Sequence, residues 1–303
     1  MYESEYKKLE NTEKMINLHE LLRVAPKLTH FVDKIHHFDF ENLLNPNNLP
    51  NGEPLSLIHT KYIYLDLCRS QYGSYETIKS KLDMILSNIA VVTTLDIRLD
   101  KDYTIKLPLM ENLKVFKFNY YAHSPFGELK PFPRQIIASF ITSAPNLEEI
   151  FIHSKHINVD PNLFQFLFRL PINCPNLRGI KMFFQLQDYY RQSNQSTQAI
   201  HHFIFIVEDS NNDNRHKLLK LEYLDLRGFF IPIDLWDKLL SLTPNLKFLA
   251  FERSTDPQNL IMKKLTARNC PNAKFDLENP FEIEEQYRIY CQRTYGFDKD
   301  RYL

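Results

Sequence analysis

The sequence is poor in glycine and cysteine, and neither sign of charge is in excess. Its 303 residues include only six glycines and four cysteines, and 37 basic residues balance 37 acidic ones. Glycines this scattered cannot form a GxGxxG turn or a P-loop, so the common phosphate-binding loops are excluded. A net charge of zero removes the long-range basic field that non-specific nucleic-acid binding needs, so we expect no nucleic-acid partner.

Long apolar runs and paired cysteines are missing as well. The apolar run at 203–207 is far shorter than the roughly 20 residues that span a bilayer, and the N-terminal residues lack the apolar core of a secretory signal. The cysteines stand far apart, at Cys68, Cys174, Cys270 and Cys291. This spacing makes a poor disulfide framework and is typical of a reducing compartment. We therefore expect a cytoplasmic or nuclear protein without a membrane partner.

A short phrase does recur along the chain. In its fullest form a small residue or cysteine is followed by Pro-Asn-Leu, and apolar residues come three and five positions after that Leu. The intervals between copies range from 21 to 44 residues. The copies are APKLTHF at 25–31, TKYIYLDL at 60–67, VVTTLDI at 91–97, MENLKVFKF at 110–118, APNLEEIFI at 144–152, CPNLRGIKM at 174–182, LLKLEYLDL at 218–226, TPNLKFLAF at 243–251 and CPNAKFDL at 270–277.

Each copy predicts a short strand, because two apolar residues two positions apart share one face of extended chain. Most copies follow an amphipathic stretch with apolar residues at helical spacing, such as Leu235, Leu239 and Leu242. The small-Pro-Asn turn should end each helix and lead into the strand. One helix–turn–strand unit cannot bury its apolar stripe alone, so the units should stack into a solenoid. The predicted helices are 13–24, 76–87, 134–142, 162–170, 234–242 and 258–269.

The phrases at 144–152, 174–182 and 243–251 resemble the leucine-rich repeat (LRR), in the cysteine-containing variety of ribonuclease-inhibitor-like and F-box/LRR proteins. The resemblance implies an α/β fold, a right-handed β-α superhelix shaped like a horseshoe, here with irregular repeats. We expect an N-terminal helix or cap at 1–24, the solenoid at 25–277 and a C-terminal cap at 278–303.

The resemblance also implies a binding surface, because the residues between the buried positions of an LRR line a concave sheet where family members bind partners. In this sequence those positions hold aromatic residues beside charges of both signs, a composition typical of protein-binding faces. The copy at 60–67 is aligned so that Tyr64 is level with Thr94. The candidate partner-binding residues are Tyr64, Asp66, Asp96, Arg98, Lys117, Phe151, His153, Lys181, Phe183, Tyr223, Asp225, Arg227 and Phe248. The alternative is that such charges only pair across strands on a solvated sheet surface.

Catalytic and metal-binding motifs do not emerge from the sequence. The histidine pairs at 36–37 and 201–202 would point to opposite faces of a strand, which is unsuitable for joint ligation of a metal. There is no GxSxG, and Cys174 and Cys270 occupy the same slot of the repeated phrase, which indicates buried core residues. We predict a non-enzymatic protein with no catalytic residues, metal or cofactor.

Protein–protein interaction through the concave sheet is therefore the predicted function. The resemblance to F-box/LRR proteins implies substrate recognition for an SCF-type ubiquitin ligase, with a Skp-type adaptor and a cullin as partners. The LP-x-E start of an F-box does not precede the first phrase, so loss of an F-box and a stand-alone repeat module both stay open. The alternatives are an LRR inhibitor or regulator of an enzyme, and an unrecognised enzyme, which would need a cluster of titratable groups in a pocket.

Overall fold

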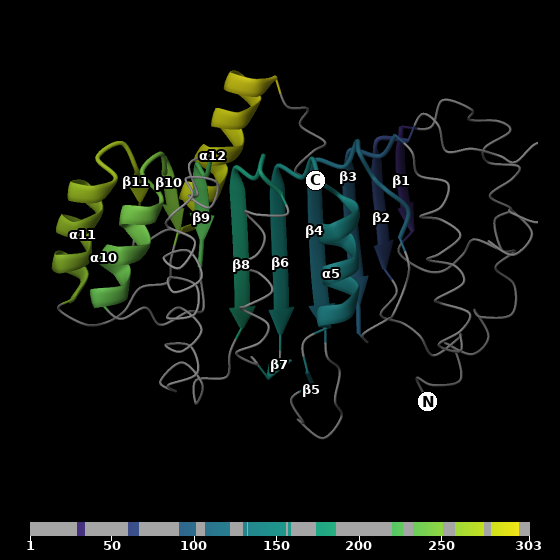
Figure 1. Ribbon diagram of the computed structural model, residues 1–303, viewed down its shortest axis with the longest axis horizontal. Coiled ribbons are helices and arrows are strands. Elements are labelled where there is room, and N and C mark those ends of the chain that lie inside the picture. The colour runs from purple at the N-terminus through teal and green to yellow at the C-terminus, as the bar shows by residue number, and fades with distance from the viewer. Residues whose placement is uncertain are drawn as a thin grey trace, which may run out of the picture.

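One open sheet of parallel strands forms the spine of the molecule (Figure 1). The computed structural model describes residues 29–33, 60–66, 91–100, 107–121, 130–131, 133–155, 157–158, 174–185, 220–226, 233–250, 258–275 and 280–296. Within these residues the sheet has nine strands that follow one another in chain order, and each neighbouring pair runs parallel. They are β1 (His30–Asp33), β2 (Tyr62–Asp66), β3 (Thr94–Leu99), β4 (Val115–Tyr121), β6 (Glu149–Lys155), β8 (Gly179–Gln185), β9 (Tyr223–Asp225), β10 (Phe248–Ala250) and β11 (Lys274–Phe275). Such a sheet is typical of a solenoid-like α/β fold.

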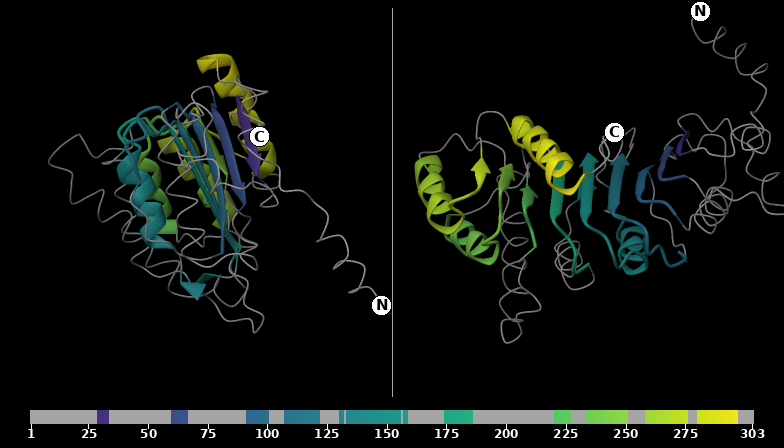
Figure 2. Two further views of the ribbon diagram at one scale, coloured as in Figure 1. Left: turned by 90° about the vertical axis from the view of Figure 1, so that its right-hand side faces the viewer. Right: turned by 90° about the horizontal axis from the view of Figure 1, so that it is seen from above.

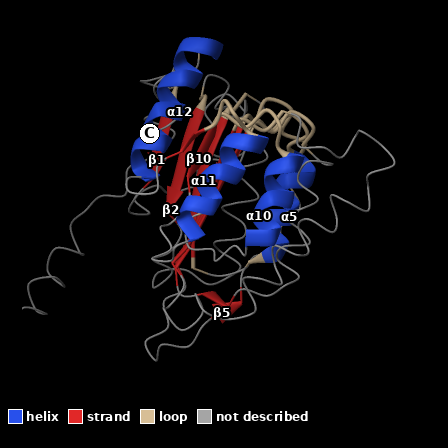
Figure 3. Cartoon of the chain, turned by 90° about the vertical axis from the view of Figure 1, so that its left-hand side faces the viewer, coloured by secondary structure: helices blue, strands red, loops and turns tan. Residues whose placement is uncertain are grey.

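The described helices lie on both sides of this sheet (Figure 2, Figure 3). One side, here named the helical face, carries α5 (Arg134–Ser143), α10 (Ile233–Leu242) and α11 (Gln258–Asn269). The opposite side, here named the open face, carries α12 (Pro280–Tyr295). The helices predicted at 134–142, 234–242 and 258–269 are confirmed, and the other three predicted helices lie outside the described residues. The short strands β5 (Lys130–Pro131) and β7 (Ile157–Asn158) pair apart from the main sheet.

On the helical face, apolar side chains in register form a core between the sheet and the helices. One row crosses seven strands as Ile63, Leu95, Phe116, Ile150, Ile180, Leu224 and Leu249. None of these side chains is more than 2% exposed. Phe116 stacks on Phe140 of α5 with ring centroids 4.5 Å apart, which places the row beneath the helices. The apolar alternation of the repeated phrase thus assigns residues to the correct face of the sheet.

The turn that follows each of the three helices on this face has the predicted form. In it the amide of the fourth residue donates to the carbonyl of the first, as Leu246 does to Thr243 at 3.0 Å and Ala273 to Cys270 at 2.9 Å. Cys174 and Cys270 are buried at the first position of the turn, which confirms their assignment to the core. Burial raises the pKa of the Cys174 thiol to about 12, as expected for a thiol that packs in the core.

The observed register corrects the alignment of one copy. Tyr64 lies level with Asp96 and not with Thr94, and Asp66 lies level with Arg98. The copy reads Tyr-Ile-Tyr-Leu and is apolar on both faces, so alternation alone cannot fix its position. Tyr64 and Asp66 stay on the open face as predicted, but each lies one row away from its predicted position.

Candidate functional site

Polar and aromatic side chains line the open face in rows. Strand spacing places neighbours within a row about 4.8 Å apart. The first row reads Tyr64, Asp96, Lys117, Phe151, Lys181 and Asp225. The second row reads Asp66, Arg98, Asn119, His153 and Phe183. The observed register therefore places most of the partner-binding residues proposed from the sequence on one continuous surface.

Helix α12 covers the C-terminal end of the open face. Its side chains form one buried cluster with those of β9 and β10, made of Tyr223, Phe248, Ala250, Ile283, Tyr287 and Cys291. The ring of Tyr287 stacks on that of Tyr223, with centroids 4.3 Å apart and planes inclined by 8°. The predicted C-terminal segment thus contains a helix that packs on the face of the sheet.

Three of the predicted partner-binding residues lie beneath this helix. Tyr223, Asp225 and Phe248 are at most 4% exposed, and the Tyr223 hydroxyl donates to Asp225 at 3.0 Å. This corrects the expectation that the three form part of an exposed binding surface, because α12 already occupies their side of the sheet. Arg227 lies outside the described residues.

A buried glutamate holds the middle of α12. Glu149 is 0% exposed, and its carboxylate accepts a hydrogen bond from the Tyr287 hydroxyl at 2.8 Å. Gly179 lies level with Glu149 on the next strand. A Cβ at 179 would lie 2.9 Å from Tyr287 Oη and 3.2 Å from Glu149 Cγ. Glycine therefore gives the helix the room to approach the strand.

The C-terminal half of α12 binds residues just before strands β9 and β10 through its tyrosine hydroxyls. Tyr295 donates to Glu222 at 2.6 Å, and Tyr290 donates to the same carboxylate at 3.2 Å. Lys247 bonds to Glu222 at 2.6 Å and to the Tyr290 hydroxyl. The guanidinium of Arg178 lies 4.1 Å from the centroid of the Tyr295 ring. Tyrosine and arginine used in this way are typical of protein–protein interfaces.

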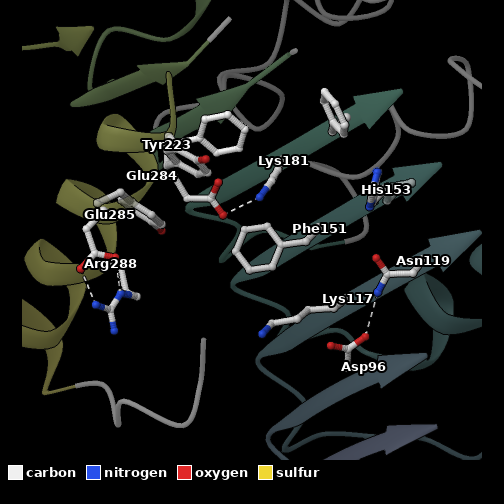
Figure 4. A pocket seen from close by; sticks show the side chains of 14 residues that line it. Asp96, Lys117, Asn119, Phe151, His153, Lys181, Tyr223, Glu284, Glu285 and Arg288 are labelled. Carbon is white, nitrogen blue, oxygen red and sulfur yellow. Dashed lines mark hydrogen bonds and ion pairs between the residues drawn. The ribbon is translucent and has the colours of Figure 1, made fainter. Parts of the chain in front are cut away.

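A pocket of about 600 Å³ lies beside α12 on the open face (Figure 4). Strands β3, β4, β6 and β8 form its floor together with Tyr223 of β9, and the N-terminal half of α12 forms its wall. Its charged and titratable lining comes from Asp96, Lys117, His153 and Lys181 on the strands and from Glu284, Glu285 and Arg288 on the helix.

Burial shifts both charged groups at the β3–β4 end of the pocket. It raises the pKa of Asp96 to about 6, although Lys117 and a hydrogen bond donated by Asn119 at 3.0 Å favour the charged form. Burial also lowers the pKa of Lys117, although Asp96 and Glu149 act in the opposite direction. Asp96 can therefore exchange a proton near neutral pH, and Lys117 carries a poorly hydrated charge.

The pocket cations nearer to α12 are paired. Lys181 forms an ion pair with Glu284, which links β8 to the helix. Arg288 donates two hydrogen bonds to the Glu285 carboxylate, one from Nε at 2.8 Å and one from Nη2. These two pairs lie within the helix or between the helix and the sheet, so they fix the wall of the pocket.

The predicted residues that remain accessible fall into two groups. Asp96, Lys117, Phe151, His153, Lys181 and Phe183 all line the pocket. Farther along the face, Arg98 Nη1 donates to Asp66 at 3.0 Å, which is the cross-strand pairing that a plain structural role predicts. Tyr64 lies beside this pair and is partly exposed.

Sequence reasoning missed the half of the pocket that α12 contributes. It placed Glu284, Tyr287 and Arg288 in a capping helix at the end of the repeats, although Ile283, Tyr287 and Cys291 recur every four residues as an apolar stripe. That stripe was the available signal for a helix that packs on another surface.

The described residues contain neither a side-chain cluster suited to a metal ion nor a membrane-spanning helix. No group of three His, Cys, Asp or Glu side chains in the described ranges is arranged to hold a metal ion. No helix among the same residues is long and apolar enough to cross a membrane. What the pocket offers chemically is aromatic surface, one titrating carboxyl group and several cations.

Comparison with known proteins identifies the fold and leaves the family open. No family model matches the sequence, and no curated protein matches it. Among nine matching chains of solved structures, a Bacteroides fragilis protein determined by a structural genomics consortium gives a TM-score of 0.52 at 17% identity. The match covers 88% of this chain and 71% of that one. At this identity the likeness shows a shared fold alone.

Proposed function

We propose that this protein binds another protein through the open face of its sheet, without an enzymatic step. The observation that carries the proposal is the part of that face, from β2 to β8, that none of the described helices covers. There the side chains of Tyr64, Arg98, Lys117, Phe151, His153, Lys181 and Phe183 are partly exposed and in register. Aromatic and charged side chains held on a rigid sheet are the usual anchors of protein interfaces.

The way α12 is held supports this proposal. The same face already packs a helix by stacking a tyrosine ring and by placing tyrosine hydroxyls on buried carboxylates. A partner that docks beside α12 would meet the same kinds of groups. The surface is therefore suited to side-chain recognition of a polypeptide.

The repeated phrases support a finer proposal, in which the sheet is that of an LRR protein of the ribonuclease-inhibitor-like or F-box/LRR type. On this basis the protein would act in the cytoplasm or nucleus and select substrates for an SCF-type ubiquitin ligase. A Skp-type adaptor and a cullin would then be additional partners.

Quantitative affinity capture from cells of the protein's own source tests both levels of the proposal. The bait carrying Tyr64→Ala and Phe183→Ala removes two partly exposed rings from the open face. The matched control carries Lys263→Ala and Lys264→Ala, which are exposed on α11 beyond the opposite face. All baits are first compared by circular dichroism, so that a lost partner is not a folding effect.

We expect a partner that is recovered with wild type and control and is lost with the open-face variant. Recovery of that partner with all three baits would show that the open face is not its site. A Skp-type adaptor and a cullin among the captured proteins would support the ligase role. Capture of an enzyme without them would favour a regulator of that enzyme.

A further inference from the structure

Lys117 stands out among the charged groups of the pocket. Lys181 and Arg288 each have a carboxylate within ion-pair distance. In the part of the chain that the structure describes, no carboxylate comes within ion-pair distance of Lys117 Nζ. The Lys117 ammonium is only partly exposed, and a poorly hydrated charge is costly unless it is paired, so an anion beside it would stabilise the pocket.

The surroundings of Lys117 restrict what that anion can be. The pocket contains Lys117, Lys181 and Arg288 against Asp96, Glu284 and Glu285, so its charges balance. A ligand with several negative charges would be repelled by the three carboxylates. A single carboxylate would pair with Lys117 and leave the other ion pairs intact.

The neighbours of Lys117 favour a ligand that carries apolar atoms next to its charge. Phe151 lies level with Lys117 on the adjoining strand, and Phe183 stands one row farther and two strands away. Figure 4 shows the Lys117 side chain extended across the pocket toward α12, with the ring of Phe151 beside it. The His153 ring packs against Phe183 with centroids 5.0 Å apart and widens the aromatic surface.

We propose that the pocket receives one aspartate or glutamate side chain of the partner polypeptide, with its carboxylate on Lys117 and its flanking residues against Phe151 and Phe183. This inference rests on the proposed function, because it names the chemistry by which the open face recognises its partner. It makes the pocket a specificity site within a larger interface.

Peptide selection provides the test. A display library of random seven-residue peptides is selected on wild type, on Lys117→Met and on Lys114→Met. Lys114 is the control, because it lies just before β4 and pairs with Glu148 at 3.2 Å outside the pocket. The best wild-type peptide is then compared with its Asn or Gln counterpart by fluorescence anisotropy on every variant, including Lys117→Arg.

On wild type and Lys114→Met we expect an enriched acidic position, and at least about tenfold weaker binding of the amide peptide. On Lys117→Met the two peptides should bind alike, and Lys117→Arg should restore the preference. Equal binding of acidic and amide peptides to wild type would overturn the inference, as would a preference that survives in Lys117→Met. A library that yields no binder would also overturn it. After any of these outcomes, the capture experiment with Tyr64→Ala and Phe183→Ala still tests the proposed function separately.

Discussion

Asp96 should reduce the stability of the folded protein at neutral pH, and Asp96→Asn should relieve that cost. The Asp96 residue is 6% exposed, and burial raises the pKa of its carboxyl group from 3.8 to about 6. A raised pKa means that the folded state holds the proton more tightly than the unfolded state. The contribution of this group to stability therefore falls as pH rises from 3.8 through 6, and it stays low above that range.

The size of the effect follows from the two pKa values. A difference of about two units corresponds to about 3 kcal/mol at pH 7.5, and to about 1 kcal/mol at pH 4.5. Asparagine removes the titration while its side-chain oxygen can still accept the hydrogen bond that Asn119 donates. The stabilisation of Asp96→Asn relative to wild type should thus grow by about 2 kcal/mol from pH 4.5 to pH 7.5.

Urea unfolding at the two pH values measures this difference. Circular dichroism follows the whole chain, and the fluorescence of Trp236, which is buried in α10, follows the C-terminal end of the sheet and its helices. Asp66→Asn is the matched control, because it removes the negative charge that pairs with Arg98 on the neighbouring strand and should destabilise the protein slightly. A stability gain of Asp96→Asn that is equal at both pH values, or larger at pH 4.5, would refute the burial of an ionised Asp96.

Three further predictions concern packing. Gly179→Ala should push Tyr287 away from Glu149 and destabilise the packing of α12 on the sheet by about 1–3 kcal/mol. Amide hydrogen exchange in α12 should then be faster, and unchanged exchange would contradict the close approach of α12 to Gly179. Leu224→Asp should prevent folding, because it puts a charge at a position that is 1% exposed within the apolar row. A soluble variant that unfolds cooperatively would show that this row is not the core. Cys174 should react with a thiol reagent at pH 8 only after unfolding by urea, because burial raises its pKa to about 12; rapid labelling of the native protein would argue against this burial.

The strands and the helical face could be predicted because their physics is local. Apolar residues two positions apart put Ile150 and Ile152 on one side of a strand, and the structure buries both. The turn with Pro-Asn marks where the preceding helix ends, so the unit can be recognised from about ten residues. The resulting order of strands across the sheet follows from the order of the units in the chain.

The row of the β2 copy could not be predicted in the same way. Tyr62, Ile63, Tyr64 and Leu65 are all large and apolar, so shifting the phrase by two residues preserves its pattern. The register is visible only against the neighbouring strand, where Tyr62 lies level with Thr94 and Tyr64 with Asp96. Such pairings depend on residues about thirty positions away, which alternation within one copy does not report.

The placement of α12 shows why an alternating pattern identifies a face without telling whether that face is covered. Tyrosine, glutamate and aspartate on a strand look like solvent-facing residues, yet Tyr223, Glu149 and Asp225 are buried here because α12 supplies aromatic rings and hydroxyl donors. Each partner carried a signal of its own, a glycine at 179 within a strand and an apolar stripe along α12. Glu149 and Tyr287 are 138 positions apart, so only the folded chain shows that the two signals belong together. The same helix that removes Tyr223 from the binding surface also creates the wall of the pocket beside Lys117, which makes α12 part of the site.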